Sequence, residues 1–193
     1  MKRILLAAAL VALTGAVGAE MTSFRIGATL GSARIDMDCS GTTTCDKTDT
    51  SFKIYGDYRL SDMWAVEAGY MKLGQLKATA YDPGDSTTSE STVKVTAPYL
   101  ALAGRAEIIP DLNCVVRVGL ARVRTEMHVT EPTLPVDLRL KTIKVKPYVG
   151  LGLEYSIMPT LQAVAGADFT HAEAHDLVTG TVRSFNLGVQ YGF

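Results

Sequence analysis

The sequence predicts an all-β protein, an eight-stranded antiparallel up-and-down transmembrane β-barrel, on the basis of three observations. Apolar and polar residues alternate with a period of two along most of the chain, which is the pattern of β-strands. The connections between these segments are short and long in turn, as in barrels with short turns on one side of a membrane and long loops on the other. Charged residues share one parity of the strands, and apolar residues share the other.

Residues 1–19 have the composition of an export signal. Two basic residues precede an apolar run, and small residues lead up to Ala19. The run is too short for a membrane-spanning helix, which needs about 20 apolar residues. We therefore expect a signal peptide over 1–19 and one barrel domain over 20–193.

Eight segments alternate in this way and are separated by residues that favour turns. The predicted strands are 23–34, 51–60, 64–74, 93–108, 114–126, 142–157, 161–171 and 181–193. The short connections are 61–63, 109–113 and 158–160, and the long, mostly polar ones are 35–50, 75–92, 127–141 and 172–180. An even number of strands places both termini of the chain on the periplasmic side and the long loops outside.

Taken in chain order, every strand has one apolar parity. In the first four strands it holds Phe24, Ile26 and Leu30, then Phe52, Ile54 and Tyr58, then Trp64, Val66 and Tyr70, then Leu100 and Leu102. In the last four it holds Val116, Val118 and Leu120, then Val149, Leu151, Leu153 and Tyr155, then Leu161 and Phe169, then Phe185, Leu187, Val189 and Tyr191. The aromatic residues fall near both ends of these stretches, as in the two aromatic girdles of membrane barrels. This parity is expected to face lipid.

The opposite parity holds charges of both signs and many of the glycines. A soluble barrel would have to bury these charges in its core, which is unfavourable, so we expect them to line the lumen. The predicted charge network consists of Asp57, Arg59, Glu67, Arg105, Glu107, Arg117, Lys146, Glu154 and Asp168. An eight-stranded barrel is only wide enough for its own side chains, so internal salt bridges are the favoured interpretation. A gated path of low conductance is the alternative.

Basic residues interrupt the lipid-facing parity at three places. Lys72, Arg122 and Arg124 lie at the external ends of their strands, where a cation costs little. They are candidates for contact with lipopolysaccharide, because Arg matches the geometry of a phosphate. The alternative is ordinary snorkelling of long side chains into the interface.

Three cysteines are present, and two of them flank a polar loop. Cys39 and Cys45 are expected to form a disulfide in the oxidising compartment to which the leader points. In so short a loop it would stabilise the fold by roughly 2–3 kcal/mol. Cys114 is left over and is interpreted as a small hydrophobic residue facing lipid.

Catalysis is the weaker interpretation of a small cluster near the external end of the seventh strand. His171, Glu173, His175 and Asp176 lie close together there, and Ser184 begins the eighth strand. A His beside carboxylates can act as a general base, and two His can bind a metal. However, no Ser follows His171 at the spacing of lipid A deacylases. We therefore predict no enzyme, no metal site and no cofactor.

Composition limits the partners. Removal of Lys2 and Arg3 with the leader would leave 17 basic and 20 acidic side chains, a net charge of −3. So mild a balance argues against nucleic acid. Recognition is usually carried by loops on a rigid scaffold, so the polar external loops are candidates for binding host surfaces or matrix.

Several segments resemble the OmpA-type transmembrane domain. Residues 52–60 (Phe-Lys-Ile-Tyr-Gly-Asp-Tyr-Arg-Leu) and 64–70 (Trp-Ala-Val-Glu-Ala-Gly-Tyr) are similar to its second hairpin region, and 146–155 to its sixth strand. The last strand, with Tyr191 and Phe193, resembles the sorting signal of outer-membrane barrels. The resemblance implies an eight-stranded barrel inserted by the barrel-assembly machinery. OmpA-type proteins proper continue into a peptidoglycan-binding domain, and we expect none here, so that anchoring role is not carried over.

The sequence therefore predicts a protein of the bacterial outer membrane with a structural role in the envelope and a salt-bridged lumen. Two alternatives stay open: a surface adhesin or ligand binder acting through the external loops, and a low-conductance ion channel. The expected partners are outer-membrane lipid and lipopolysaccharide, the assembly machinery during insertion, and host or matrix ligands at the loops.

Overall fold

The computed structural model describes residues 23–36, 43–82, 87–130, 137–174 and 178–193. The strands in these ranges are β1 (Phe24–Asp36), β2 (Thr44–Asp46), β3 (Thr48–Arg59), β4 (Trp64–Asp82), β5 (Thr87–Ile109), β6 (Leu112–Thr130), β7 (Asp137–Ser156), β8 (Leu161–Ala174) and β9 (Val178–Gly192). Within the described residues, no helix is long and apolar enough to cross a membrane. The predicted signal peptide over 1–19 lies outside the described residues and stays a prediction.

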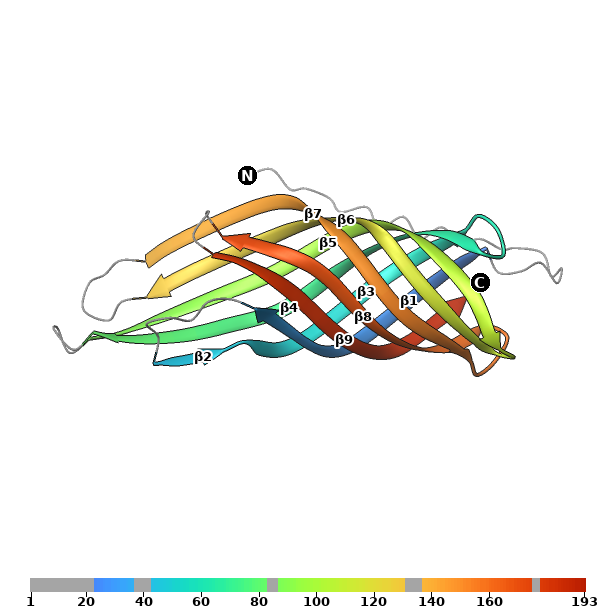
Figure 1. Cartoon of the computed structure of the whole chain (residues 1–193), viewed down its shortest axis with the longest axis horizontal. Helices are drawn as coiled ribbons and strands as arrows, with labels where there is room; N and C mark the ends of the chain where they lie inside the picture. The colour runs from blue at the N-terminus through green and yellow to red at the C-terminus, as the bar shows by residue number, and fades with distance from the viewer. Residues whose placement is uncertain (1–22, 37–42, 83–86, 131–136, 175–177) are drawn as a thin grey trace, which may run out of the picture.

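Eight of the strands form a closed antiparallel barrel, which confirms the predicted fold class (Figure 1). Around the wall the order is β4-β3-β1-β9-β8-β7-β6-β5, and β5 pairs back with β4. Each of these eight strands pairs with the next wall strand along the chain, with β2 passed over between β1 and β3, and the first and last strands, β1 and β9, pair with each other. The short β2 adds three residues to β4 beyond the barrel wall.

The register of the pairs gives the stagger of the barrel. A row of paired residues leads once around the wall through Leu153, Ala165, Leu187, Leu30, Phe52, Lys72, Thr96, Arg124 and Ile143. It returns to β7 at residue 143 after leaving it at residue 153, a stagger of ten residues. Such a stagger requires strands that are tilted from the barrel axis, and Figure 1 shows this tilt.

The three short turns lie where they are predicted, but the strands extend further at the other end of the barrel. β4 and β5 pair as far as Asp82 and Thr87, and β6 and β7 as far as Thr130 and Asp137. The predicted loops 75–92 and 127–141 are therefore mostly hairpin. Thr and other β-branched residues pair well in strands, and polarity alone does not distinguish an exposed hairpin from a loop.

The two faces of the wall exchange character towards this external end. Along β6 the outward residues change from Leu120 to Arg122 and Arg124, all exposed. The inward residues change from Arg117 to the apolar Val123, both buried. On the periplasmic side of this change β6 is apolar outside and polar inside, and beyond it the arrangement of β6 is that of a water-soluble protein, while its neighbour β7 keeps Val145 and Ile143 exposed on the outside. The change therefore marks the external edge of the membrane-facing surface.

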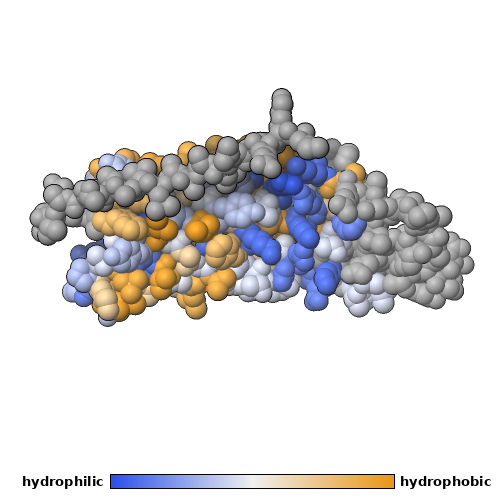
Figure 2. Space-filling view, turned by 180° about the vertical axis from the view of Figure 1, so that it is seen from behind, coloured by the Kyte–Doolittle hydropathy of each residue, from blue (hydrophilic) through white to orange (hydrophobic). Residues whose placement is uncertain are grey.

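The membrane-facing surface is a continuous apolar belt. Its exposed residues are Phe24, Ile26, Leu30, Phe52, Ile54, Tyr58, Trp64, Val66, Tyr70, Leu100, Leu102, Val116, Val118, Leu120, Val149, Leu151, Leu153, Tyr155, Phe185, Leu187, Val189 and Tyr191. Figure 2 shows part of it from behind, with hydrophobic residues in orange and a hydrophilic band in blue beside them on the side of the external end. An outward apolar band of this kind is what a membrane barrel presents to lipid.

Candidate functional site

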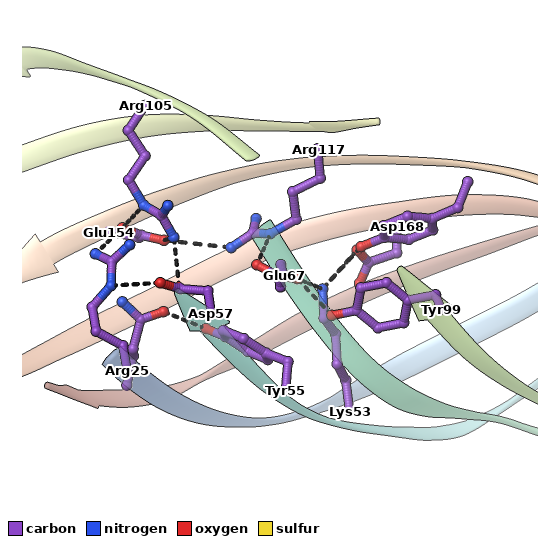
Figure 3. A network of polar contacts seen from close by, with 12 residues as sticks. Arg25, Lys53, Tyr55, Asp57, Glu67, Tyr99, Arg105, Arg117, Glu154 and Asp168 are labelled. Atoms are coloured by element: carbon purple, nitrogen blue, oxygen red, sulfur yellow. Dashed lines mark hydrogen bonds and ion pairs between the residues drawn. The ribbon is translucent and has the colours of Figure 1, made fainter. Parts of the chain in front are cut away.

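A network of ion pairs fills the lumen at the level of the apolar belt (Figure 3). In its periplasmic part, the Asp57 carboxylate accepts hydrogen bonds from Arg25 Nε (2.9 Å) and Arg105 Nη2 (2.8 Å). Glu154 Oε2 accepts one from Arg105 Nε at 3.0 Å and lies 3.5 Å from Arg25 Nη1. Two guanidinium groups and two carboxylates therefore alternate across the lumen.

The external part of the network is centred on Glu67 and Lys53. Arg117 Nε donates to Glu67 Oε2 at 2.6 Å, and Lys53 Nζ lies 3.4 Å from Glu67 Oε1 and 3.1 Å from Asp168 Oδ1. Arg117 Nη2 also lies 3.4 Å from Glu154 Oε1, which joins the two parts. All these side chains are at most 6% exposed.

Tyrosines complete the external part. The Tyr99 hydroxyl donates to Glu67 and the Tyr148 hydroxyl to Asp168. The Lys53 ammonium lies 5.0 to 5.6 Å from the ring centroids of Tyr55, Tyr99 and Tyr148, within the range of cation–π attraction. The lysine is thus enclosed by aromatic faces and carboxylates.

The last strand, β9, contributes amides to the same network. Asn186 Nδ2 donates to Asp168 Oδ2 at 2.7 Å, and Gln190 Oε1 accepts from the Tyr55 hydroxyl at 3.0 Å. The network therefore draws on every strand of the barrel wall. Its four basic groups, Arg25, Lys53, Arg105 and Arg117, match its four acidic groups, Asp57, Glu67, Glu154 and Asp168. This balance matters because an unpaired charge would be costly at such burial.

Glycines make room for the tyrosine rings. Tyr55 lies opposite Gly27, Tyr99 opposite Gly69, and Tyr148 opposite Gly119 in their cross-strand pairs. A Cβ added to Gly27 would lie 2.3 Å from Tyr55 Cζ, and one added to Gly69 would lie 2.7 Å from the Tyr99 ring. Gly27 and Gly69 therefore leave the space that the Tyr55 and Tyr99 rings occupy, whereas a Cβ at Gly119 would meet the backbone of Leu100 and Ala101.

An apolar layer closes the lumen on the external side of the network. It is built from buried inward residues of the strand extensions: Ala33, Ile35, Met71, Leu73, Val93, Val95, Ala97, Val123, Ala172 and Val182. Met127 packs against this layer. The lumen is thus filled twice, by paired charges in the membrane and by hydrophobic side chains above them.

The structure brings six of the nine predicted lumen residues into this network: Asp57, Glu67, Arg105, Arg117, Glu154 and Asp168. Glu107 lies elsewhere, exposed beside the turn between β5 and β6, where the register shifts between Glu107 and Ile109. Arg59 lies half-buried at the periplasmic mouth, and its Nε has no hydrogen-bond partner. Lys146 binds Glu173 on the external side. All three lie beyond the part of their strand that the apolar belt covers. Strand parity alone was therefore not sufficient to predict whether they join the network.

Arg25 and Lys53 also belong to the network but were not among its predicted residues, although both stand on the strand parity of the other charges. The prediction also omitted the three tyrosines, whose signal was available in the sequence. Tyr55, Tyr99 and Tyr148 share the parity of the charges, and an aromatic residue on the polar parity of a barrel strand indicates lumen packing rather than a girdle.

β7 and β8 separate at the external side of the belt. Their pairing ends at Val149 and Phe169, next to Pro147, which has no N–H to donate. The Thr170 hydroxyl donates instead to the Pro147 carbonyl oxygen at 3.0 Å.

Beyond that point, Lys144 and Lys146 both bind the Glu173 carboxylate. Hydrogen bonds from these lysines lower the pKa of Glu173 to about 2. Glu173 therefore joins the ends of β7 and β8 where the backbone does not.

The cluster for which catalysis was the weaker interpretation is not assembled by the described residues. Glu173 binds the two lysines, whereas His171 is exposed, with Nε2 3.4 Å from the Thr181 hydroxyl. His175 and Asp176 lie outside the described residues.

The cysteines and the sorting residues lie as follows. Cys39 lies outside the described residues, so its disulfide with Cys45 stays a prediction. Cys114 is a half-buried free thiol on β6. Tyr191 and Phe193 contact each other edge to face at the periplasmic end, with ring centroids 5.0 Å apart.

Known proteins provide an independent comparison. The model of the family described as OmpA-like transmembrane domain matches residues 19–193. A comparison with curated protein sequences finds no match.

Three of the similar solved structures are bacterial proteins. Neisserial surface protein A has a TM-score of 0.58 at 14% identity, over 89% of this chain and 97% of its own. Outer membrane protein OprG of Pseudomonas aeruginosa has a TM-score of 0.57 at 15% identity, over 88% of this chain and 95% of its own. Ail, the attachment invasion locus protein of Yersinia pestis, has a TM-score of 0.52 at 14% identity, over 88% of this chain and 99% of its own. It was solved in complex with the heparin analogue sucrose octasulfate. At these identities the likeness concerns the fold.

Proposed function

This chain belongs to the OmpA-like transmembrane domain family, and from that premise we propose that it is a non-conducting barrel of the bacterial outer membrane with a structural role in the envelope. Export by the leader over 1–19 and insertion by the barrel-assembly machinery are part of the proposal. The exposed apolar belt supports the location, since it needs lipid to cover it.

The filled lumen is the observation that carries the structural role. Every charged residue of the network has a partner of opposite charge, and the apolar layer lies across the same path. An ion would have to break several buried pairs and then cross a hydrophobic layer. Both steps are unfavourable, so we expect the barrel not to conduct ions.

Single-channel recording in planar bilayers tests the proposal. Refolded protein is expected to give no openings, and so is the Glu67→Gln variant, because the apolar layer stays in place. Discrete small openings that change with Glu67→Gln would favour a gated path through the network. Porin-sized currents from the pure wild-type protein would overturn the filled lumen. Deletion of the protein in its host is expected to raise sensitivity to detergents that the outer membrane excludes.

A second candidate function is binding of sulfated or otherwise polyanionic sugars at the cell surface. On the external extensions of β4 to β7 lies a groove of about 620 Å³, lined among others by Lys77, Lys94 and Lys141. The register places Lys94 and Lys141 on either side of Glu126, so the basic side chains outnumber the acidic one. Ail, a protein of similar fold, was solved with a heparin analogue. These observations support the surface-binding hypothesis at this groove.

Titration with sucrose octasulfate checks the second candidate. The wild-type barrel is expected to bind it, and Lys77→Gln/Lys141→Gln is expected to bind at least about tenfold more weakly, at about 1 kcal/mol for each lost cation near a polyanion. Equal binding by the two proteins would contradict the assignment of the groove. Binding by neither protein would contradict the second candidate and leave the structural role as the single proposed function.

A further inference from the structure

Three basic side chains stand directly above the apolar belt on one side of the barrel. Lys72 on β4 follows the belt residue Tyr70 by two positions, and Arg122 on β6 follows Leu120 by two positions. Arg124 lies in the same cross-strand row as Lys72, with Thr96 of β5 between them. All three are exposed on the outer face.

Two of these charges are uncompensated. Arg124 forms an ion pair with Glu126. Lys72 and Arg122 have no hydrogen bond and no ion pair with any residue that the structure describes. A side chain that holds a full charge without a partner, next to a surface buried in lipid, needs its counter-charge from the surroundings.

The opposite side of the barrel provides the contrast. Arg34 of β1 and Arg183 of β9 face each other at the corresponding external edge, two positions or more beyond the belt residues Leu30 and Phe185. Both bind Asp36, at 3.4 Å and 3.1 Å. There one acid of the protein binds both arginines, whereas on the β4–β6 side Glu126 binds Arg124 and no acid among the described residues binds Lys72 or Arg122.

We infer that Lys72, Arg122 and Arg124 form a binding surface for the phosphates of an outer-leaflet glycolipid of the lipid A type. Two strand spacings separate Lys72 from Arg124, about 10 Å, so one headgroup with two phosphates can contact both. Arg binds a phosphate with two parallel N–H donors, and Lys adds a point charge. The acyl chains of the same lipid would then lie along Tyr70, Leu100 and Leu120 of the belt.

Position favours a lipid over a soluble polyanion. A residue two positions beyond the belt is about 7 Å farther along its strand, which is the depth of the headgroups rather than of free solvent. The groove with Lys77, Lys94 and Lys141 lies farther out on the same strands and is a separate surface.

Lipid binding by the full-length, refolded barrel tests the inference. Lipid A with both phosphates, and the same lipid after enzymatic dephosphorylation, are titrated in detergent and the bound lipids counted by native mass spectrometry. The variant is Lys72→Gln/Arg122→Gln. The matched control is Arg34→Gln/Arg183→Gln, which removes two charges from the same edge of the barrel. Heat-modifiable migration on gels verifies that each variant is folded.

The expected result is a loss of at least about tenfold in lipid A binding for Lys72→Gln/Arg122→Gln, at about 1 kcal/mol for each cation near anionic lipid. The control is expected to stay within about twofold, because both of its arginines are already bound to Asp36. Wild-type protein is expected to prefer the phosphorylated lipid.

Three results would overturn the inference. The first is unchanged binding by the variant, and the second is an equal loss in the control. The third is displacement of lipid A from Lys72 and Arg122 by sucrose octasulfate at equal concentration, which would assign the surface to a soluble polyanion.

Discussion

Arg117 Nε lies 2.6 Å from Glu67 Oε2 in the middle of the lumen, and the same guanidinium joins this external part of the charge network to Glu154. Arg117 also reaches Glu154, and Glu67 also reaches Lys53. Removal of one charge therefore affects groups on both sides of it. A barrel held together in this way depends on complete pairing more than on any single salt bridge.

Replacement of Glu67 by Gln is expected to destabilise the folded barrel by about 3–5 kcal/mol, because Arg117 and Lys53 stay buried without that carboxylate. Urea unfolding in lipid vesicles, followed by tryptophan fluorescence of Trp64, measures the change. Glu107→Gln is the control, since Glu107 is exposed at the periplasmic end. Equal midpoints for the two variants would show that the network does not stabilise the fold.

A methyl group at Gly27 is expected to disturb the Tyr55 ring. The added Cβ would lie 2.3 Å from Tyr55 Cζ, which forces the ring away from its hydrogen bond with Gln190. Overpacking of this kind costs about 1–3 kcal/mol. The control is Gly56→Ala, whose Cβ would meet only the end of the Phe24 ring, at 3.2 Å. If both variants unfold at the same urea concentration, the glycine does not serve the tyrosine.

Gly74→Ala is expected to destabilise the junction between the barrel and the external hairpin. Gly74 has a φ of +90°, and the register of β4 and β5 shifts between Lys72 and Gln75 at this point. An added Cβ would also lie 2.8 Å from Asp49 Cβ, and Asp49 accepts the Gln75 N–H. The positive φ alone costs a residue with a Cβ about 1–2 kcal/mol. Hydrogen exchange of β4 beyond Gly74 should become faster, while exchange in the belt stays unchanged.

The ion pairs of Glu173 give a prediction about pH. Lys144 and Lys146 lower the pKa of Glu173 to about 2, below that of an ordinary glutamate. A lowered pKa in the folded state stabilises the protein above the ordinary value, and this contribution is lost as the pH falls through about 2. A ¹³C titration of the carboxyl, assigned with Glu173→Gln, should show this low midpoint. Lys144→Gln/Lys146→Gln should return the midpoint towards the ordinary value, and no change would exclude the proposed pairing.

Parity was sufficient to predict the barrel and the centre of its lumen. Asp57, Glu67, Arg117 and Glu154 stand on strands that the belt covers on the outside, so an inward charge there finds its partners among the other inward polar and charged groups. The same argument fails for Glu107 because strand parity ceases to control orientation at a turn. For Lys146 it fails because β7 has lost its partner β8 at that level.

The external apolar layer was beyond prediction for a different reason. Val93, Val95 and Val123 occupy the parity that carries charges lower down. All three lie at the outer ends of the predicted strands 93–108 and 114–126, and the polar segments beyond them were predicted as loops, so an enclosed space was not expected there. Only the pairing of β4 with β5 and of β6 with β7 creates the enclosed space that these residues fill.

The pairing of β1 with β9 makes completion of the barrel conditional on the end of the domain. Arg25, on the first strand, finds Glu154 only on β7, and Asp168 and Tyr55 receive their amide partners only from β9. Contacts between such distant parts of a chain form late and slowly. Until they form, Arg25 lacks Glu154, and Asp168 and Tyr55 lack their amide partners, so the polar face of the growing sheet is open and incompletely paired. An unfinished barrel is therefore unfavourable in the bilayer. We expect stable insertion into the membrane to coincide with the pairing of β1 and β9.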